Sequence, residues 1–207
     1  MPPQKRFNSE RFPWGEFLKK LAAIAIPIAL QNLLTTTGSM VDTMMVAPLG
    51  EKTVGALGLC AQFSSLMFAG YWGFVGGGMM FFSQYWGAKD EDGINRSYGV
   101  TLSFMMGVAL IFAVLAMGFP QVVMGIYTDK EEIQKIGVSY LRLVGLAYPI
   151  QVLAMAMSAL LRSTEQVKVP LYGGIGAVVS NCFFNYLLIF GKLFFPAMGV
   201  TGAAIAT

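Results

Sequence analysis

Long uncharged stretches of apolar residues, separated by short clusters of charge, are the feature that most constrains the fold of this chain. A helix needs about 20 consecutive apolar residues to cross the ~30 Å hydrocarbon core of a bilayer, so each stretch predicts a membrane-spanning helix. The predicted spans are residues 17–47, 53–82, 97–119, 137–161 and 170–190, and a sixth helix begins near residue 198. The sequence therefore predicts an all-α, polytopic transmembrane bundle of five spans plus the start of a sixth.

Composition agrees with a protein whose main partner is the lipid bilayer, and it argues against several other classes. Only 12% of the residues are charged and 56% are hydrophobic, whereas about 25% are charged in a typical soluble domain. With no His and two Cys, a Cys/His zinc site is not expected. No nucleophile–base pair suggests an enzyme. No basic face carries interleaved aromatic residues, so the chain is not expected to bind nucleic acid, and no cofactor is expected.

The distribution of Lys and Arg predicts the orientation of the bundle. The amino-terminal segment and the connections on its side carry nine: Lys5, Arg6, Arg11, Lys19, Lys20, Lys89, Arg96, Arg162 and Lys168. The opposite connections carry four: Lys52, Lys130, Lys135 and Lys192. Because cytoplasmic loops carry the excess of positive charge, residues 1–16 are expected to be a cytoplasmic segment and residues 17–207 the transmembrane part.

One carboxylate lies inside the first span. From Leu21 to Leu49, Asp42 is the only ionisable residue, and an ionisable group at membrane depth is a candidate functional site. Successive helix residues advance by about 100°, so Gln31, Thr35, Gly38 and Asp42 project within roughly 60° of one another. This polar stripe suits a wall that faces a water-filled cavity. The alternative is that Asp42 simply ends the first helix at the outer headgroups.

A second polar pair lies on the fifth span. Asn181 and Asn185 are four residues apart and therefore share one face of a helix. Counted from Pro170, Asn185 falls in the same half of the membrane as Asp42. One acid with two amides offers oxygen ligands for Na⁺, at Asp42 and Asn181 first, and the same acid could instead hold a proton. The alternative is that the asparagines only join helices by hydrogen bonds. Gln62, on the second span, is a weaker candidate for a cavity wall.

Three further segments carry expectations of their own. Pro27 lies inside the first span, where a proline usually kinks a helix. Residues 127–143 mix charges with apolar residues at helical spacing, which predicts a short helix outside the membrane that leads into the fourth span, or else a solvated loop. Residues 198–207 cover only ~15 Å as a helix, so the sequence is expected to be a fragment or a truncated reading frame.

Several stretches together resemble the multidrug and toxic compound extrusion (MATE) family. They are "IPIALQNLL…MVDTMMVAPLG", "SQYWGAKDED", "ALLRSTEQVKVP" and "NCFFNYLLIFGKLFFPAMGVTGAAIAT". The resemblance implies an antiporter of two six-helix lobes in the cell (plasma or inner) membrane, which expels cationic or amphiphilic compounds in exchange for Na⁺ or H⁺. This chain would supply most of the amino-terminal lobe, and its partners would be small organic cations and a missing carboxy-terminal lobe.

The resemblance also implies roles for individual residues. Asp42 matches the acid that binds the coupling cation or proton, and Pro27 matches a proline at which the first helix of some members bends. Asn181 matches the first polar ligand on the fifth span, and Thr207 matches a hydroxyl near the site. Asn185 stands where some members carry a second acid, a departure that leaves Asp42 as the only acid. "LRSTEQVKVP" lacks the glycines usual after its Leu-Arg, which predicts a changed turn.

Three other functions are weighed against this one. A related flippase for a lipid-linked sugar would need basic residues in its cavity, and Arg142 is the only candidate recognised from the sequence. A non-transporting membrane subunit or half-transporter remnant is the second. An integral membrane enzyme is the third, and it lacks any catalytic constellation.

Overall fold

The computed structural model describes residues 14–191 and 198–206, and every regular element among them is a helix. The elements are α1 (Trp14–Val46), the 3₁₀ turn η1 (Ala47–Leu49), α2 (Glu51–Ala88), α3 (Glu91–Gly118), α4 (Pro120–Tyr127), α5 (Glu131–Ser163), α6 (Lys168–Phe190) and α7 (Val200–Ala206). Five of these helices are long and apolar enough to cross a membrane. The predicted all-α bundle of five spans and the start of a sixth is confirmed.

Local capping explains why α2 and α3 extend further than the predicted spans. Lys89 ends α2 in the left-handed conformation, and Asp90 caps α3 by accepting a hydrogen bond from the backbone N–H of Gly93 at 2.9 Å. Such caps satisfy backbone groups that would otherwise lack partners at the helix ends. The charged connection between the second and third spans is therefore reduced to two residues.

The charged segment before the fourth span is also helical. Residues 131–143 are the first turns of α5 itself, so neither a separate short helix nor a solvated loop occupies them. The short helix of this region is α4, which begins at Pro120, two residues after α3 ends at Gly118. Proline is favoured in the first turn of a helix because its missing N–H has no intrahelical partner there. The sequence analysis had assigned no helix to residues 120–127.

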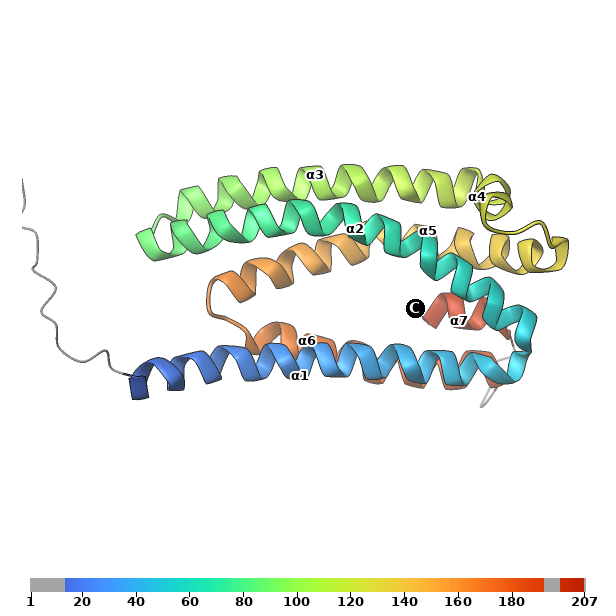
Figure 1. The fold of residues 1–207 in the computed structure, drawn as a ribbon, viewed down its shortest axis with the longest axis horizontal. Coiled ribbons are helices and arrows are strands. Elements are labelled where there is room, and N and C mark those ends of the chain that lie inside the picture. Colours follow the sequence, from blue (N-terminus) through green and yellow to red (C-terminus); the bar gives the residue numbers. More distant parts are fainter. Residues whose placement is uncertain (1–13, 192–197, 207) are drawn as a thin grey trace, which may run out of the picture.

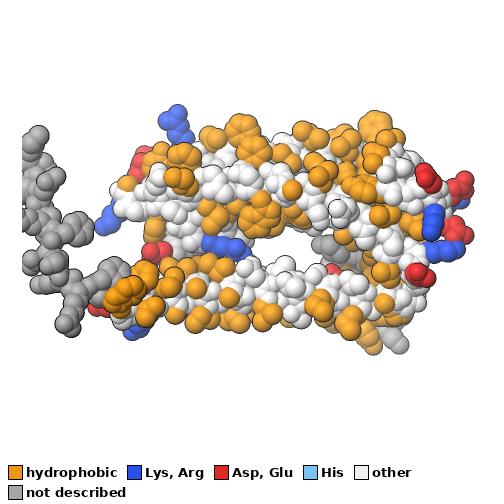
Figure 2. Space-filling view, in the orientation of Figure 1, with side chains coloured by type: hydrophobic (Ala, Val, Ile, Leu, Met, Phe, Trp, Pro, Cys, Tyr) orange, Lys and Arg blue, Asp and Glu red, His pale blue; other side chains and the backbone are white. Residues whose placement is uncertain are grey.

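The long helices form two blocks that lie one above the other in Figure 1. The three-helix block contains α2, α3 and α5, each packed against the other two, with α4 against α5. The two-helix block is the pair α1 and α6, with α7 packed on α6 and α5. Figure 2 shows a hollow between the blocks, apolar side chains along their outer faces, and charged side chains gathered mainly at the two ends.

The two blocks differ in how much they bury. The three-helix block holds a continuous core of buried residues that includes Cys60, Met67, Met105, Leu141 and Tyr148. In α1, by contrast, Gly38 and Val46 are the only buried residues. A smaller cluster of Val46, Ile189 and Ala203 joins α1, α6 and α7 at the end where α1 turns into α2.

Close packing of α7 on α6 depends on a glycine. A Cβ atom placed on Gly202 would lie 2.6 Å from the carbonyl oxygen of Leu188, a distance that no side chain tolerates. Small residues let helix backbones approach in this way.

The helix α1 continues through Pro27 without interruption, so a bend at Pro27 stays a prediction.

Candidate functional site

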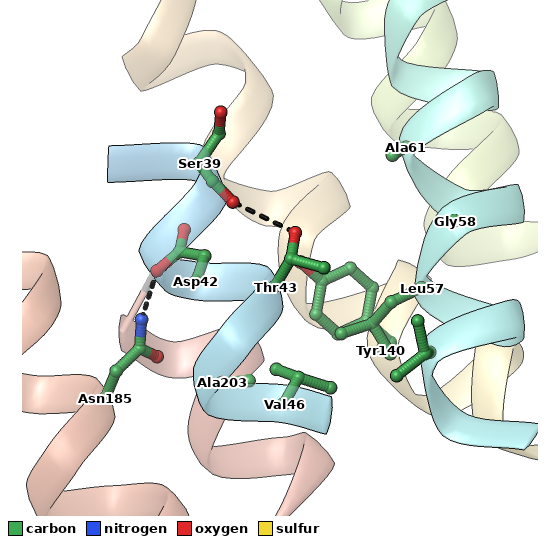
Figure 3. Close-up of a pocket in the computed structure, with 11 residues that line it drawn as sticks. Ser39, Asp42, Thr43, Val46, Leu57, Gly58, Ala61, Tyr140, Asn185 and Ala203 are labelled. Atoms are coloured by element: carbon green, nitrogen blue, oxygen red, sulfur yellow. Dashed lines mark hydrogen bonds between the residues drawn. The ribbon is translucent and has the colours of Figure 1, made fainter. Parts of the chain in front are cut away.

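Asp42 lies on the wall of a cavity of about 270 Å³ between α1, α2 and α6. This Asp42 cavity is lined by Ser39, Asp42, Thr43 and Val46 of α1, by Val54, Leu57, Gly58 and Ala61 of α2, and by Tyr140, Asn185 and Ala203. Figure 3 shows the side chains of Asp42 and Asn185 pointing toward each other across the gap between α1 and α6. The helix α1 continues beyond Asp42 for another turn, to Val46.

A chain of hydrogen bonds joins Asp42 to α6 and α7. The side-chain amide of Asn185 donates to Oδ1 of Asp42 and also to Oδ1 of Asn181, the latter at 3.2 Å. The amide of Asn181 in turn donates to the backbone carbonyl oxygen of Ala206 at 3.2 Å. The structure therefore brings together three residues selected from the sequence and adds a backbone oxygen that sequence reasoning missed. Thr207 lies outside the described residues.

The polar chain leaves one buried acceptor oxygen without a donor. Asn185 is almost fully buried, and its Oδ1 has no hydrogen-bond partner among the described residues. Buried polar atoms are nearly always satisfied, so an unpaired acceptor calls for an explanation. The described salt bridges are Lys52–Glu132 and Lys135–Glu131, so no basic side chain in that part of the chain neutralises Asp42. Carboxylate, amide and carbonyl oxygens are the groups that bind hard cations.

Acidic residues alone do not define this site. Among the described residues no group of three or more His, Cys, Asp and Glu side chains could hold a metal ion. Any cation held here would therefore rely on the asparagines and on backbone carbonyl groups beside the single carboxylate. The sequence predicts the acid and the two amides as ligands, which stays a prediction, and the backbone carbonyl groups are an addition from the structure.

Close contact between α1 and α6 explains the meeting of Asp42 and Asn185, and it corrects the proposed stripe. A Cβ atom placed on Gly38 would lie 3.2 Å from a methyl group of Val178 on α6. Gly38 is buried, so it serves helix packing and is not an open gap in a cavity wall. The polar stripe on α1 is divided at this contact into two parts.

Gln31 and Thr35, on the other side of Gly38, line a second cavity of about 400 Å³. This Arg162 cavity is lined by Gln31, Asn32, Thr35, Thr36, Tyr71, Trp72, Val75, Met79, Met155, Ser158, Ala159 and Arg162. Gln31 and Thr35 thus line a cavity, but a different one from that of Asp42. Gln62 is exposed on α2 and lines neither the Asp42 cavity nor the Arg162 cavity.

Arg162 is a residue that the sequence analysis missed. It was counted as a charge of the connection after the fourth span, but it belongs to the last turn of α5 and donates from Nη2 to Oε1 of Gln31 at 2.8 Å. Arg142, named from sequence as the only basic candidate for a cavity, is exposed and lines neither of the two cavities. The sequence feature that could have indicated a cavity position for Arg162 is the Leu-Arg of "ALLRST" at the end of a predicted span.

Comparison with known proteins points to one family. The family model MatE matches residues 27–187. The probable multidrug resistance protein YoeA of Bacillus subtilis is 28% identical over 190 residues, which are 91% of this chain and 41% of YoeA. The probable multidrug resistance protein NorM of Neisseria meningitidis is 25% identical over 205 residues, or 95% of this chain and 44% of NorM.

Solved structures show the same fold. A mutant of the Vibrio cholerae MATE transporter VcmN superposes with a TM-score of 0.84 at 20% identity, and the match covers 97% of this chain and 44% of VcmN. An outward-facing MATE transporter of the MOP superfamily superposes with a TM-score of 0.75 at 21% identity, over 91% of this chain and 41% of that one. The chain thus spans less than half the length of the relatives it matches.

Proposed function

The chain belongs to the MatE family, and from this premise we propose that it is the amino-terminal half of a cation-coupled antiporter that exports cationic or amphiphilic organic compounds. The curated relatives that carry the name multidrug resistance protein support export of such compounds. Because the chain spans 41% to 44% of their length, a second lobe is part of this proposal.

The hydrogen bond between Asp42 and Asn185 is the observation that carries the proposal. It joins a carboxylate on one membrane-crossing helix to an amide on another, at the wall of a cavity. Ionisable groups at membrane depth are costly, and they commonly mark ion pathways and proton relays. An acid kept in such a place with no basic partner among the described residues is suited to bind and release a cation.

The coupling ion is Na⁺ or H⁺. Asp42 supplies the negative charge, and Oδ1 of Asn181, Oδ1 of Asn185 and the carbonyl oxygen of Ala206 supply neutral oxygens. Reorientation of the Asn185 amide would turn its unpaired oxygen toward a bound Na⁺. For a proton, Asp42 alone would suffice, and Asn185 would accept a hydrogen bond from the protonated acid. The neutral oxygens favour Na⁺ slightly.

Coupling follows if cation binding changes the packing of α1. Neutralising Asp42 removes the cost of a bare carboxylate, and we propose that α1 then bends or repacks near Pro27 and narrows the drug cavity. Cation and drug must favour different conformations for one to drive the other. The membrane potential supplies ~2.3 kcal/mol per charge for each 100 mV.

With nine Lys and Arg on the amino-terminal side against four on the other, the proposed amino terminus is cytoplasmic and the Asp42 cavity opens to the outside.

Efflux by Asp42→Asn protein tests the proposal. The substitution preserves shape and removes the charge, so we expect uphill efflux of a cationic dye to be lost while the protein still reaches the membrane. Asp129→Asn, which changes an acid in the connection between α4 and α5, is the matched control and should transport like the wild type. Efflux that Asp42→Asn leaves unchanged would remove Asp42 from the mechanism. Repeating the assay with a Na⁺ gradient or a pH gradient alone identifies the coupling ion.

A flippase for a lipid-linked sugar is the second candidate, and the position of Arg162 favours it. A basic side chain at a cavity wall could hold a pyrophosphate, the group that such a lipid carries. Reconstituted protein that moves a lipid-linked oligosaccharide between leaflets, but expels no cationic dye, would establish this function in place of the first.

A further inference from the structure

Arg162 carries the positive charge of a cavity that contains no acid. None of the residues that line the Arg162 cavity is Asp or Glu, and Arg162 has no ion pair among the described residues. Its Nη2 donates to Gln31, a neutral partner, and its Nε is buried without a hydrogen-bond acceptor. Arg162 as a whole is only half-buried, but its Nε lacks both water and a protein acceptor, and a buried donor without a partner is costly.

The remaining walls fit the body of an organic compound. Tyr71 and Trp72 offer aromatic surfaces, and Met79 and Met155 offer flexible apolar side chains that adapt to different shapes. At about 400 Å³ the cavity falls in the size range of small-molecule sites. Such sites combine apolar walls with a few polar groups that fix the orientation of the ligand. Here the fixed polar group is the guanidinium.

We propose that the Arg162 cavity binds the carboxylate of aromatic organic anions or zwitterions, and that Arg162 selects for that group. The guanidinium presents donors in a planar fork that matches a carboxylate, and among the described residues only its Nη2 is bound to a protein acceptor. This inference rests on the proposed function, because it names the residue that recognises one chemical group of a compound carried by the same transporter.

A pair of dyes that differ only in one group tests the proposal. A zwitterionic rhodamine with a free carboxylate and its methyl ester share the same aromatic body, and their binding to the reconstituted protein is measured by fluorescence polarisation. In Arg162→Gln, affinity for the carboxylate dye is expected to fall about tenfold or more, while affinity for the ester changes less than about twofold. Arg162→Lys should recover part of the preference.

Gln31→Glu distinguishes ligand recognition from a structural tie. This variant places a carboxylate beside Arg162, so an internal acid would compete with the carboxylate of the dye. We expect it to abolish the preference for the carboxylate dye while the ester still binds, which also shows that the variant is folded. If Arg162 only fastened α5 to α1, Gln31→Glu would strengthen that contact and leave the preference unchanged.

The outcomes separate the two proposals. Equal effects of Arg162→Gln on both dyes, or a preference that survives Gln31→Glu, would overturn the carboxylate site while leaving export of cationic dyes in place. Binding of the carboxylate dye that is displaced by anionic phospholipid, but by no soluble aromatic carboxylate, would also overturn it and assign the cavity to a lipid headgroup. Absence of any dye export would contradict the proposed function, whichever dye binds.

Discussion

The three-helix block and the two-helix block are built in opposite ways. In α2, α3 and α5, large side chains such as Met67, Met105 and Tyr148 are fully buried in one core. In the other block α1 buries only Gly38 and Val46, and it meets α6 through a glycine and through polar side chains. Both cavities lie where the two blocks face each other, with walls from each.

The difference indicates which part can move. A core of interlocked side chains has few alternative packings, whereas a helix with little buried surface can tilt or bend at low cost. The polar contacts that join the blocks are few, and the bond between Arg162 and Gln31 is one of them. We therefore expect the three-helix block to act as a scaffold and α1 with α6 to carry the conformational change.

The largest stability effect is expected where α1 and α6 touch. Gly38→Leu would drive a side chain into Val178, and such overpacking typically costs about 1–3 kcal/mol. Thermal unfolding of the purified protein in detergent measures the loss. Gly99→Leu is the matched control, since the position is helical and exposed and no atom lies within 4 Å of an added Cβ.

A second substitution decides whether steric overlap is the cause. Val178→Ala removes both methyl groups that face Gly38, so the double variant Gly38→Leu, Val178→Ala should recover part of the lost stability. If Gly38→Leu melts at the wild-type temperature, the contact between α1 and α6 is looser than described, and the division of the polar stripe into two cavities loses its basis.

The sequence predicted the parts of the fold that depend on simple periodic patterns. Uncharged length alone located all five spans, and helical spacing placed Asn181 and Asn185 on one face. The meeting of Asp42 with Asn185 was anticipated only as a common depth in the membrane. Their hydrogen bond depends on which faces of α1 and α6 touch, and one sequence does not contain that information.

What the sequence did not reveal has specific physical causes. Gly38 was included in the stripe that faces a cavity because a residue without a side chain is compatible with either a helix or a cavity beside it. Arg162 was counted with a loop because charge usually marks the end of a span, and only the packing of α5 against α1 places it at a cavity. The helix α4 is short, and its eight residues are too few for a membrane span, so span length gave no reason to predict a helix there.

An effect of at most the same size is expected inside the three-helix block. The hydroxyl groups of Ser64 and Tyr148 are 2.8 Å apart, and Ser64 also donates to the carbonyl oxygen of Cys60 at 3.1 Å. Ser64→Ala would leave the fully buried Tyr148 hydroxyl without this partner and should cost about 1–3 kcal/mol. Tyr148→Phe removes the hydroxyl itself and should cost less, about 1 kcal/mol.

Dye-binding measurements make this pair a test of the scaffold. Both variants should lower the melting temperature in that order while the preference between the two rhodamine dyes stays as in the wild type. A change in dye preference would show that the three-helix block also responds to ligand, which contradicts its assignment as a fixed scaffold.

The smallest effect is expected in the connection between the blocks. Glu165, between α5 and α6, has a φ of 63°, in the left-handed region that side chains other than glycine disfavour. The changed turn expected from the missing glycines is therefore a turn in which glutamate adopts the conformation that glycine favours.

Glu165→Gly should stabilise the protein, because glycine adopts this conformation without strain. The gain should be at most about 1 kcal/mol, because the greater freedom of glycine in the unfolded chain offsets part of it. Gln166→Gly, next to it and without a positive φ, should be neutral or slightly destabilising in the same melting experiment. Equal melting shifts for the two variants would mean that the left-handed conformation of Glu165 stores no strain. The connection would then not resist a movement of α6 against the three-helix block.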